Sequence, residues 1–240
     1  MDWEDEGYVL AVRPHGESSA IVSLLTAEHG RHAGLVRGGQ SRRNRGLLQP
    51  GNRVSATWRA RLEEHLGSYT LELQSSAVAS ILDAPGRLAA MSSAVTLIEE
   101  TLPEREPSHG IFAMFNTLME ALDGEHWAAT YVVWELNLMM DIGFGLDLSE
   151  CAATGATEDL IYVSPKSGRA VCRAAGEAYK DKLLALPAFL LGVDEASRVD
   201  IANGLALSGF FLERHVYGPR QRHLPDTRRR LAEKFSTEQS

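Results

Sequence analysis

Up to about residue 80, apolar and polar residues follow the pattern of short β-strands. Between residues 54 and 58, and again between residues 69 and 73, every second residue is apolar, which is the period of a half-buried strand. The pattern predicts five strands, at residues 7–13, 20–26, 33–37, 54–60 and 69–74. Five short strands with a long connection before the fourth favour a small closed barrel of the OB-fold type, with a small sandwich as the alternative.

After Ala84-Pro85-Gly86 the apolar period becomes that of helices. Apolar residues fall on one helical face at Leu88, Met91, Val95, Ile98 and Leu102, and Pro103 ends this run. The pattern predicts further helices at residues 108–122 with Ser108 as N-cap, 131–142, 198–216 and 225–235. We therefore expect an α+β protein of two domains: an OB-fold β-barrel over residues 1–80, and an all-α helical domain over residues 81–240.

A loop-rich insert at about residues 151–178 interrupts the predicted helices. It contains the only two cysteines, Cys151 and Cys172, and a strand-like segment at residues 160–163. The cysteines stand where a zinc ribbon has the first cysteine of each pair, but the partner positions hold Thr154 and Ala175. The insert therefore resembles a degenerate zinc ribbon, and we expect no bound metal, no cofactor and no structural disulfide.

Charge is segregated along the chain. The protein has a formal net charge of -8, yet seven arginines and no Asp or Glu occur between His32 and Arg61. The densest part runs from Arg37 to Gly46, where guanidinium groups suit a polyanionic backbone. Nucleic acid is therefore the first hypothesis for a ligand, and ordinary solvated surface is the alternative. Trp58 and Tyr69 lie on strands of the same domain, where core packing competes with base stacking.

A second group of basic residues lies near the end of the chain. Its members are Arg220, Arg222, Arg228, Arg229, Arg230 and Lys234. Such a group either extends an electrostatic track for a polyanion or gives a terminal helix ordinary solubilising charge. The sequence leaves both readings open.

Catalytic motifs are missing from the sequence. It has no phosphate-binding Gly-x-x-x-x-Gly-Lys-Ser/Thr loop, no His-Glu-x-x-His and no Gly-x-Ser-x-Gly, and its eight histidines are scattered. We therefore predict a protein that is not an enzyme. The acidic start differs from a targeting signal, and no apolar run approaches the roughly 18 residues of a membrane span. The expected location is the cytoplasm, without membrane contact.

Several sequence motifs are spread along nearly the whole chain. The N-terminal motifs are Gly7-Tyr8-Val9-Leu10, Arg13-Pro14-His15-Gly16-Glu17-Ser18-Ser19, Leu25-Thr26-Ala27-Glu28-His29-Gly30-Arg31, Val36-Arg37-Gly38-Gly39, Ser41-Arg42-Arg43 and Leu48-Gln49-Pro50-Gly51. Later motifs are Trp134-Glu135-Leu136-Asn137-Leu138 and Gly143-Phe144-Gly145-Leu146-Asp147-Leu148 before Cys151. Together these motifs resemble the RecO family of bacterial recombination mediators and DNA repair proteins, and the first 50 residues carry most of the resemblance.

The resemblance implies an N-terminal OB-fold, a helical C-terminal domain and, in many members, a four-cysteine zinc module. It also implies binding of single- and double-stranded DNA, annealing of complementary strands without ATP, and work with RecR to load RecA onto DNA coated by single-stranded DNA-binding protein, at the nucleoid. The DNA-binding residues that it implies are Arg31, Arg37, Arg42, Arg43 and Arg45.

Two other functions remain open from the sequence. The acidic helical domain suits a protein-interaction adaptor, and the barrel suits an RNA-binding module. Phe210, Phe211 and Leu212 beside Arg214 suit the binding of the acidic, apolar C-terminal tail of single-stranded DNA-binding protein. Packing of these apolar residues in the core is the alternative.

Overall fold

The computed structural model describes residues 1–193 and 195–236. By its internal contacts the chain divides into two compact units, residues 1–124 and 125–240, and each unit is described by itself. Among the described residues, no helix has the length and apolar character needed to cross a membrane.

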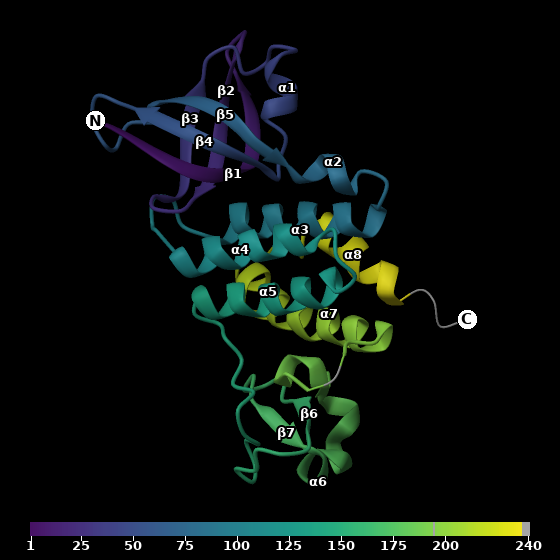
Figure 1. Ribbon diagram of the computed structural model, residues 1–240. Helices are drawn as coiled ribbons and strands as arrows, with labels where there is room; N and C mark the ends of the chain where they lie inside the picture. Colours follow the sequence, from purple (N-terminus) through teal and green to yellow (C-terminus); the bar gives the residue numbers. More distant parts are fainter. Residues whose placement is uncertain (194, 237–240) are drawn as a thin grey trace. The chain divides into compact units, whose positions relative to one another are not determined.

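Five strands of the first unit form a closed barrel in the order β1-β2-β3-β5-β4 (Figure 1). The strands are β1 (Asp2–His15), β2 (Ser19–Thr26), β3 (Gly30–Val36), β4 (Asn52–Arg59) and β5 (Ser68–Ser76). Neighbouring strands are antiparallel except β3 and β5, which meet in a single parallel pair, Leu35 with Ser68. The predicted strands and the OB-type barrel are thus confirmed, and the sandwich alternative is wrong.

Strand β1 is longer than predicted because its acidic start also alternates. Its first half pairs with β4 and its second half with β2, with a register shift between Val9 and Ala11. Trp3 pairs with Trp58 of β4, and the two rings stack with centroids 5.6 Å apart. The acidic residues on either side of Trp3 in β1 are more exposed than Trp3. The acidic start of the chain is therefore part of an ordinary half-buried strand, which the sequence pattern did not predict.

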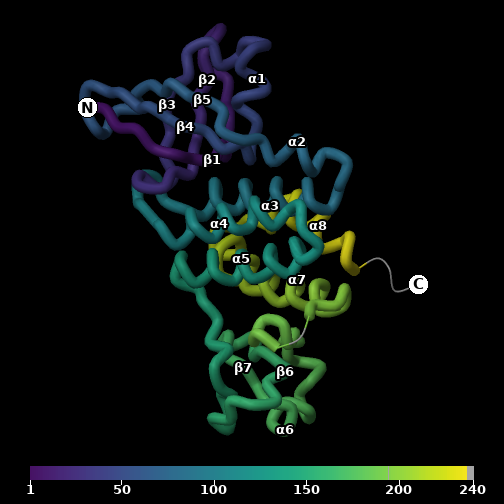
Figure 2. The backbone as a smooth tube through the Cα atoms, viewed as in Figure 1, coloured from purple at the N-terminus to yellow at the C-terminus, as the bar shows by residue number. Residues whose placement is uncertain are grey.

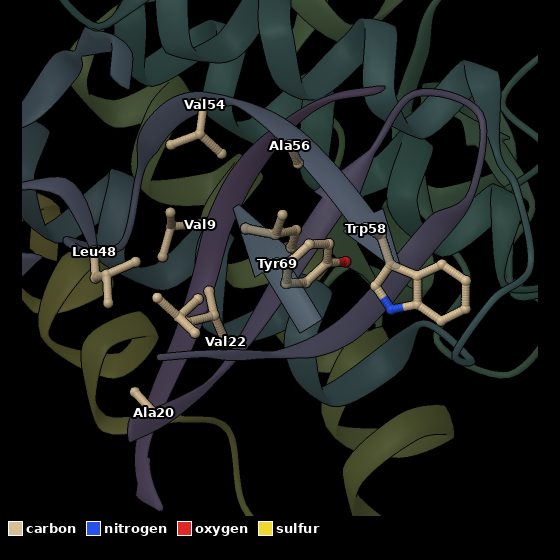
Figure 3. Packing of buried hydrophobic residues seen from close by; sticks show 10 residues of the cluster. Val9, Ala20, Val22, Leu48, Val54, Ala56, Trp58 and Tyr69 are labelled. Atoms are coloured by element: carbon tan, nitrogen blue, oxygen red, sulfur yellow. The ribbon is translucent and has the colours of Figure 1, made fainter. Parts of the chain in front are cut away.

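Apolar side chains from every strand fill the barrel. Figure 3 shows Val9, Val22, Val54, Trp58 and Tyr69 turned toward one another. The exposed fractions of Trp58 and Tyr69 are 1% and 5%, so both belong to the core and neither is a platform for base stacking. The core leaves no room for a side chain at Gly67, where an added Cβ would lie 2.3 Å from the Trp58 indole nitrogen.

A neutral histidine is buried in this aromatic core. The Nδ1 atom of His32 lies 2.8 Å from the Tyr69 hydroxyl. Burial, followed by the charges of Arg105 and His29, lowers the pKa of His32 to about 4. In the unfolded chain this histidine binds a proton near pH 6.5, whereas in the folded protein it binds one only near pH 4. The contribution of neutral His32 to the free energy of unfolding is therefore fully present above pH 6.5, and it is lost as the pH falls toward 4.

We expect acidification from pH 7 to pH 4.5 to cost about 2 to 3 kcal/mol of unfolding free energy through His32. Urea unfolding of wild type and of His32→Gln at both pH values isolates the contribution of His32 to the unfolding free energy. The variant keeps a hydrogen-bonding side chain at this position but has no imidazole to titrate. The exposed His109, changed to Gln, is the matched control. Equal pH dependence in wild type and His32→Gln would contradict the assignment.

Three helices follow the barrel strands in the first unit: α2 (Ala77–Ile81), α3 (Pro85–Thr101) and α4 (His109–Ala121). Helix α3 ends just before Pro103, as predicted. The Ser108 side chain accepts a hydrogen bond from the Ile111 amide at 3.3 Å, which confirms the predicted N-cap of α4. Tyr8 of β1 donates to Asn116 of α4 at 2.8 Å, so barrel and helices pack within one unit.

The second unit is built on α5 (Trp127–Asp141), α7 (Arg198–Leu212) and α8 (Asp226–Ser236). Helix α7 contacts both α5 and α8, and Figure 2 shows α5 and α7 running side by side. A π-helical turn at Glu213–Tyr217 and a 3-10 turn at Gly218–Arg220 lead from α7 toward α8. Phe211 and Leu212 are buried, so core packing, and not an exposed docking site, explains these two residues.

A buried ion pair ties α8 to the other two helices. Arg228 and Glu135 are 1% and 0% exposed, and Nη2 of Arg228 lies 2.8 Å from Oε2 of Glu135. Ser208 of α7 also donates to this carboxylate, and Tyr131 donates to its other oxygen at 3.0 Å. The structure therefore removes Arg228 from the basic surface group in which the sequence placed it.

The insert between α5 and α7 forms a small antiparallel sheet in the order β7-β6-β8. Its elements are β6 (Leu160–Val163), β7 (Ala170–Cys172), α6 (Arg173–Gly176), β8 (Leu184–Ala185) and the 3-10 turns Glu177–Lys182 and Ala188–Leu191. Strand β6 matches the predicted strand.

The side chains of the insert do not supply the set of ligands that structural zinc needs. Such a site needs about four ligands, whereas the insert offers two sulfurs, and the Thr154 hydroxyl lies 3.6 Å from the sulfur of Cys172. Within the described residues, no group of three or more His, Cys, Asp or Glu side chains surrounds a common point. The likeness to a zinc ribbon stays a prediction drawn from the cysteine spacing.

Candidate nucleic-acid interface

The arginine loop, residues 37–51 between β3 and β4, is a hydrogen-bonded structure. The carbonyl of Gly38 accepts the Ser41 amide at 2.9 Å and the Asn44 side chain at 3.0 Å. Gly38 has a φ of +65°, a conformation that glycine adopts without strain. The short helix α1 (Asn44–Leu47) follows. The loop therefore holds its own shape.

Three contacts anchor the arginine loop on the barrel. The Gln40 side chain donates to the carbonyl of Ser19, the first residue of β2, at 2.8 Å. Leu48 is buried among the barrel core residues beside Val9 (Figure 3). Asn52, the first residue of β4, donates to the carbonyl of Gly46 at 2.7 Å. A loop fixed at these points presents its other side chains without a large entropic cost on binding.

Four arginines of this loop are exposed. They are Arg37, Arg42, Arg43 and Arg45. In the described part of the chain, no hydrogen bond or ion pair engages their guanidinium groups. Guanidinium forks match phosphate oxygens in a bidentate manner. The structure thus brings four of the five predicted arginines together with free donors.

A groove runs beside the arginine loop where β3 and β5 separate. Its volume is about 410 Å³. Arg37, Asn44 and Leu47 line it, together with Arg59 and residues 68–71. Arg59 is exposed, so a further cation enters from β4. The groove is therefore lined by two arginines, Arg37 from the loop and Arg59 from β4.

Arg31 lies apart from the arginine loop. It is the second residue of β3, opposite Leu25, whereas Arg37 follows the far end of that strand. Its Nε donates to the carbonyl of Leu102 at 2.8 Å, and its Nη1 lies 3.3 Å from Glu104. Arg31 therefore already holds the end of α3 against the barrel. Its part in DNA binding stays a prediction, and sequence spacing gave no signal for these distant partners.

Two other arginines of the first unit also have acidic partners. Nη2 of Arg13 lies 3.2 Å from Glu99, and Nη2 of Arg53 lies 2.5 Å from Glu6. Their charges are therefore compensated in place. Of the seven arginines in the acid-free segment, only Arg53 has an acidic partner among the described residues, and the four arginines of the loop form the densest group without one.

Comparison with known families covers most of the chain. The family described as "Recombination protein O N terminal" matches residues 1–76, and "Recombination protein O C terminal" matches residues 83–225. The DNA repair protein RecO of Rhodospirillum centenum is 51% identical over 237 residues, which cover 98% of this chain and 95% of that protein. Those of Rhodospirillum rubrum and Phenylobacterium zucineum are each 50% identical, covering 98% of this chain and 96% and 98% of theirs. With both halves matched in order, the chain belongs to the RecO family of DNA repair proteins.

Proposed function

We propose that this protein is a recombination mediator that binds the phosphate backbones of single- and double-stranded DNA through its arginine loop. The observation that carries the proposal is the set of four exposed arginines, unpaired among the described residues, on a loop fixed by hydrogen bonds in a protein of net charge -8. An acidic protein that leaves cations uncompensated on one loop has a local field suited to a polyanion.

The proposed mechanism is annealing by charge neutralisation. Arginines that contact phosphates of two strands reduce the repulsion between them, while base pairing alone supplies sequence recognition. No covalent step and no ATP are needed, so the protein acts without catalysis. With RecR, it would then load RecA onto DNA coated by single-stranded DNA-binding protein, in the cytoplasm at the nucleoid.

The division of the chain into two domains at residue 80 also stays a prediction.

One observation favours the alternative of a protein-interaction adaptor. Helix α5 presents apolar side chains to solvent, with Val133 40% and Met140 62% exposed. They line a groove of about 220 Å³ together with Leu136, Leu148 and Leu190. An apolar groove of this kind suits the apolar end of a partner's tail, so the adaptor role and DNA binding are compatible in one chain.

We expect the protein to accelerate annealing of complementary oligonucleotides that are precoated with single-stranded DNA-binding protein, to the same extent with and without ATP. The rate is followed by fluorescence energy transfer between labels on the two strands. Addition of the free C-terminal tail peptide of the coating protein distinguishes the adaptor role, because it competes only where the tail is bound. No acceleration on coated DNA would overturn the mediator proposal, and acceleration on structured RNA alone would favour the RNA-binding alternative.

A further inference from the structure

Two cysteines lie close together inside the insert, on segments that are distant in sequence. Cys151 begins a turn in which the Gly155 amide donates to its carbonyl at 2.8 Å, and Cys172 is the last residue of β7. The two residues are 1% and 6% exposed, whereas residues 152–155 of the turn are exposed. The pair is therefore buried beneath a short surface turn, not deep in the helical core.

Hydrogen-bond donors converge on the sulfur of Cys151. The Cys172 amide donates to it at 3.2 Å. The Thr154 hydroxyl lies 3.6 Å from the sulfur of Cys172. Burial raises the pKa of the Cys151 thiol, but these donors and the amides of Ala153 and Thr154 outweigh it and lower the pKa to about 6. Donors held in this way stabilise a thiolate without a metal.

The same contact places the second sulfur within reach of the first. The backbone nitrogen of Cys172 is already 3.2 Å from the sulfur of Cys151. Rotation about χ1 of Cys172 turns its own sulfur about the Cα–Cβ bond between staggered positions. Because the Cys151 sulfur already lies beside the Cys172 backbone, this rotation can bring the two sulfurs toward each other, and the Thr154 hydroxyl lies beside the Cys172 sulfur.

We propose that Cys151 and Cys172 form a modification site, at which a peroxide converts the two thiols into an intramolecular disulfide. The Cys151 thiolate attacks one peroxide oxygen, the O–O bond breaks, and hydroxide leaves, so that Cys151 becomes a sulfenic acid. The Cys172 thiol then attacks this sulfur, the S–S bond forms, and the thiol proton leaves with the hydroxyl as water. The two sulfurs are oxidised, the peroxide is reduced, and a dithiol reverses the change. Thr154 acts as a positioning residue.

The test treats the full-length protein with hydrogen peroxide, then unfolds it, alkylates the remaining thiols and measures its mass. We expect both thiols to be lost, the mass to fall by about 2 Da, a peptide linking the two cysteines to appear, and dithiothreitol to restore the thiols. In Cys172→Ser, dimedone should capture Cys151 as sulfenic acid, and in Cys151→Ser the remaining thiol should stay reduced. Thr154→Val should slow the reaction, and Thr154→Ser should restore it.

Protection of both thiols in the folded protein, under peroxide that oxidises them in urea, would overturn the proposal. So would disulfide-linked dimers in place of the intramolecular link. Each variant is first compared with wild type by circular dichroism, and the wild-type result alone decides if a variant fails to fold. DNA binding plays no part in this readout, so the site and the proposed function stand or fall separately.

Discussion

Replacement of Arg228 by alanine should destabilise the second unit by about 3 to 5 kcal/mol, because it leaves the Glu135 carboxylate buried without its countercharge. Both side chains are almost fully buried. Arg228 also donates to the Leu205 carbonyl at 2.7 Å, so the substitution leaves that acceptor without its charged donor as well. Urea unfolding followed by the far-ultraviolet circular dichroism of the helices measures the loss.

Two further variants separate the buried charge from the helix itself. Arg229→Ala, one residue along α8, removes an exposed arginine paired with Asp226, and such surface pairs contribute at most about 1 kcal/mol. The double variant Glu135→Gln with Arg228→Met removes both charges and keeps an acceptor for Ser208. We expect it to be more stable than Arg228→Ala. A loss below about 1 kcal/mol in Arg228→Ala would contradict the structural role of the pair.

The sequence predicted the barrel because its strands obey simple alternation, and it missed Arg228 because charge at a helix surface and charge in a core look alike in one dimension. Buried arginines are rare, and burial depends on a partner that the fold supplies. Here the partner is Glu135, 93 positions away. It lies inside the Trp134–Leu138 motif of the family resemblance, and the structure gives that glutamate a physical reason to be there.

For the nucleic-acid interface, too, the local sequence predicted one part, and contacts between distant residues decided the other. The arginine loop was visible because seven arginines without acids are unusual in an acidic chain. Which arginines of the first unit keep free guanidinium groups was not visible, since it depends on long-range partners: Glu104 engages Arg31, just before the acid-free segment, and Glu6 engages Arg53 within it. Compensation by distant acids, and not local spacing, therefore distinguishes the arginines that hold the fold from those with free donors.

Replacement of Arg42, Arg43 and Arg45 together by alanine should weaken single-stranded DNA binding by about 50-fold at 0.15 M salt, if each contacts one phosphate and binding converges at 1 M salt. The salt dependence should change as well. Each phosphate contact contributes about 0.7 to the slope of log K against log salt for single strands, so the slope should flatten by about 2. Fluorescence anisotropy with a labelled oligonucleotide, repeated over a range of salt concentrations and several sequences, measures both.

A loss of charge anywhere on the protein also lowers its attraction for DNA, so the triple variant needs a charge-matched control. Arg173 and Lys180 are exposed residues of the insert and Arg169 is a half-buried one, and each is paired with a nearby acid. Changing these three to alanine alters the net charge by the same amount without touching the arginine loop. If the loop contacts phosphates directly, only the loop variant flattens the salt slope, and it does so equally for all sequences. Equal effects of the two variants would show that the arginines act through the overall field alone, and unchanged binding in the loop variant would place the DNA on another surface.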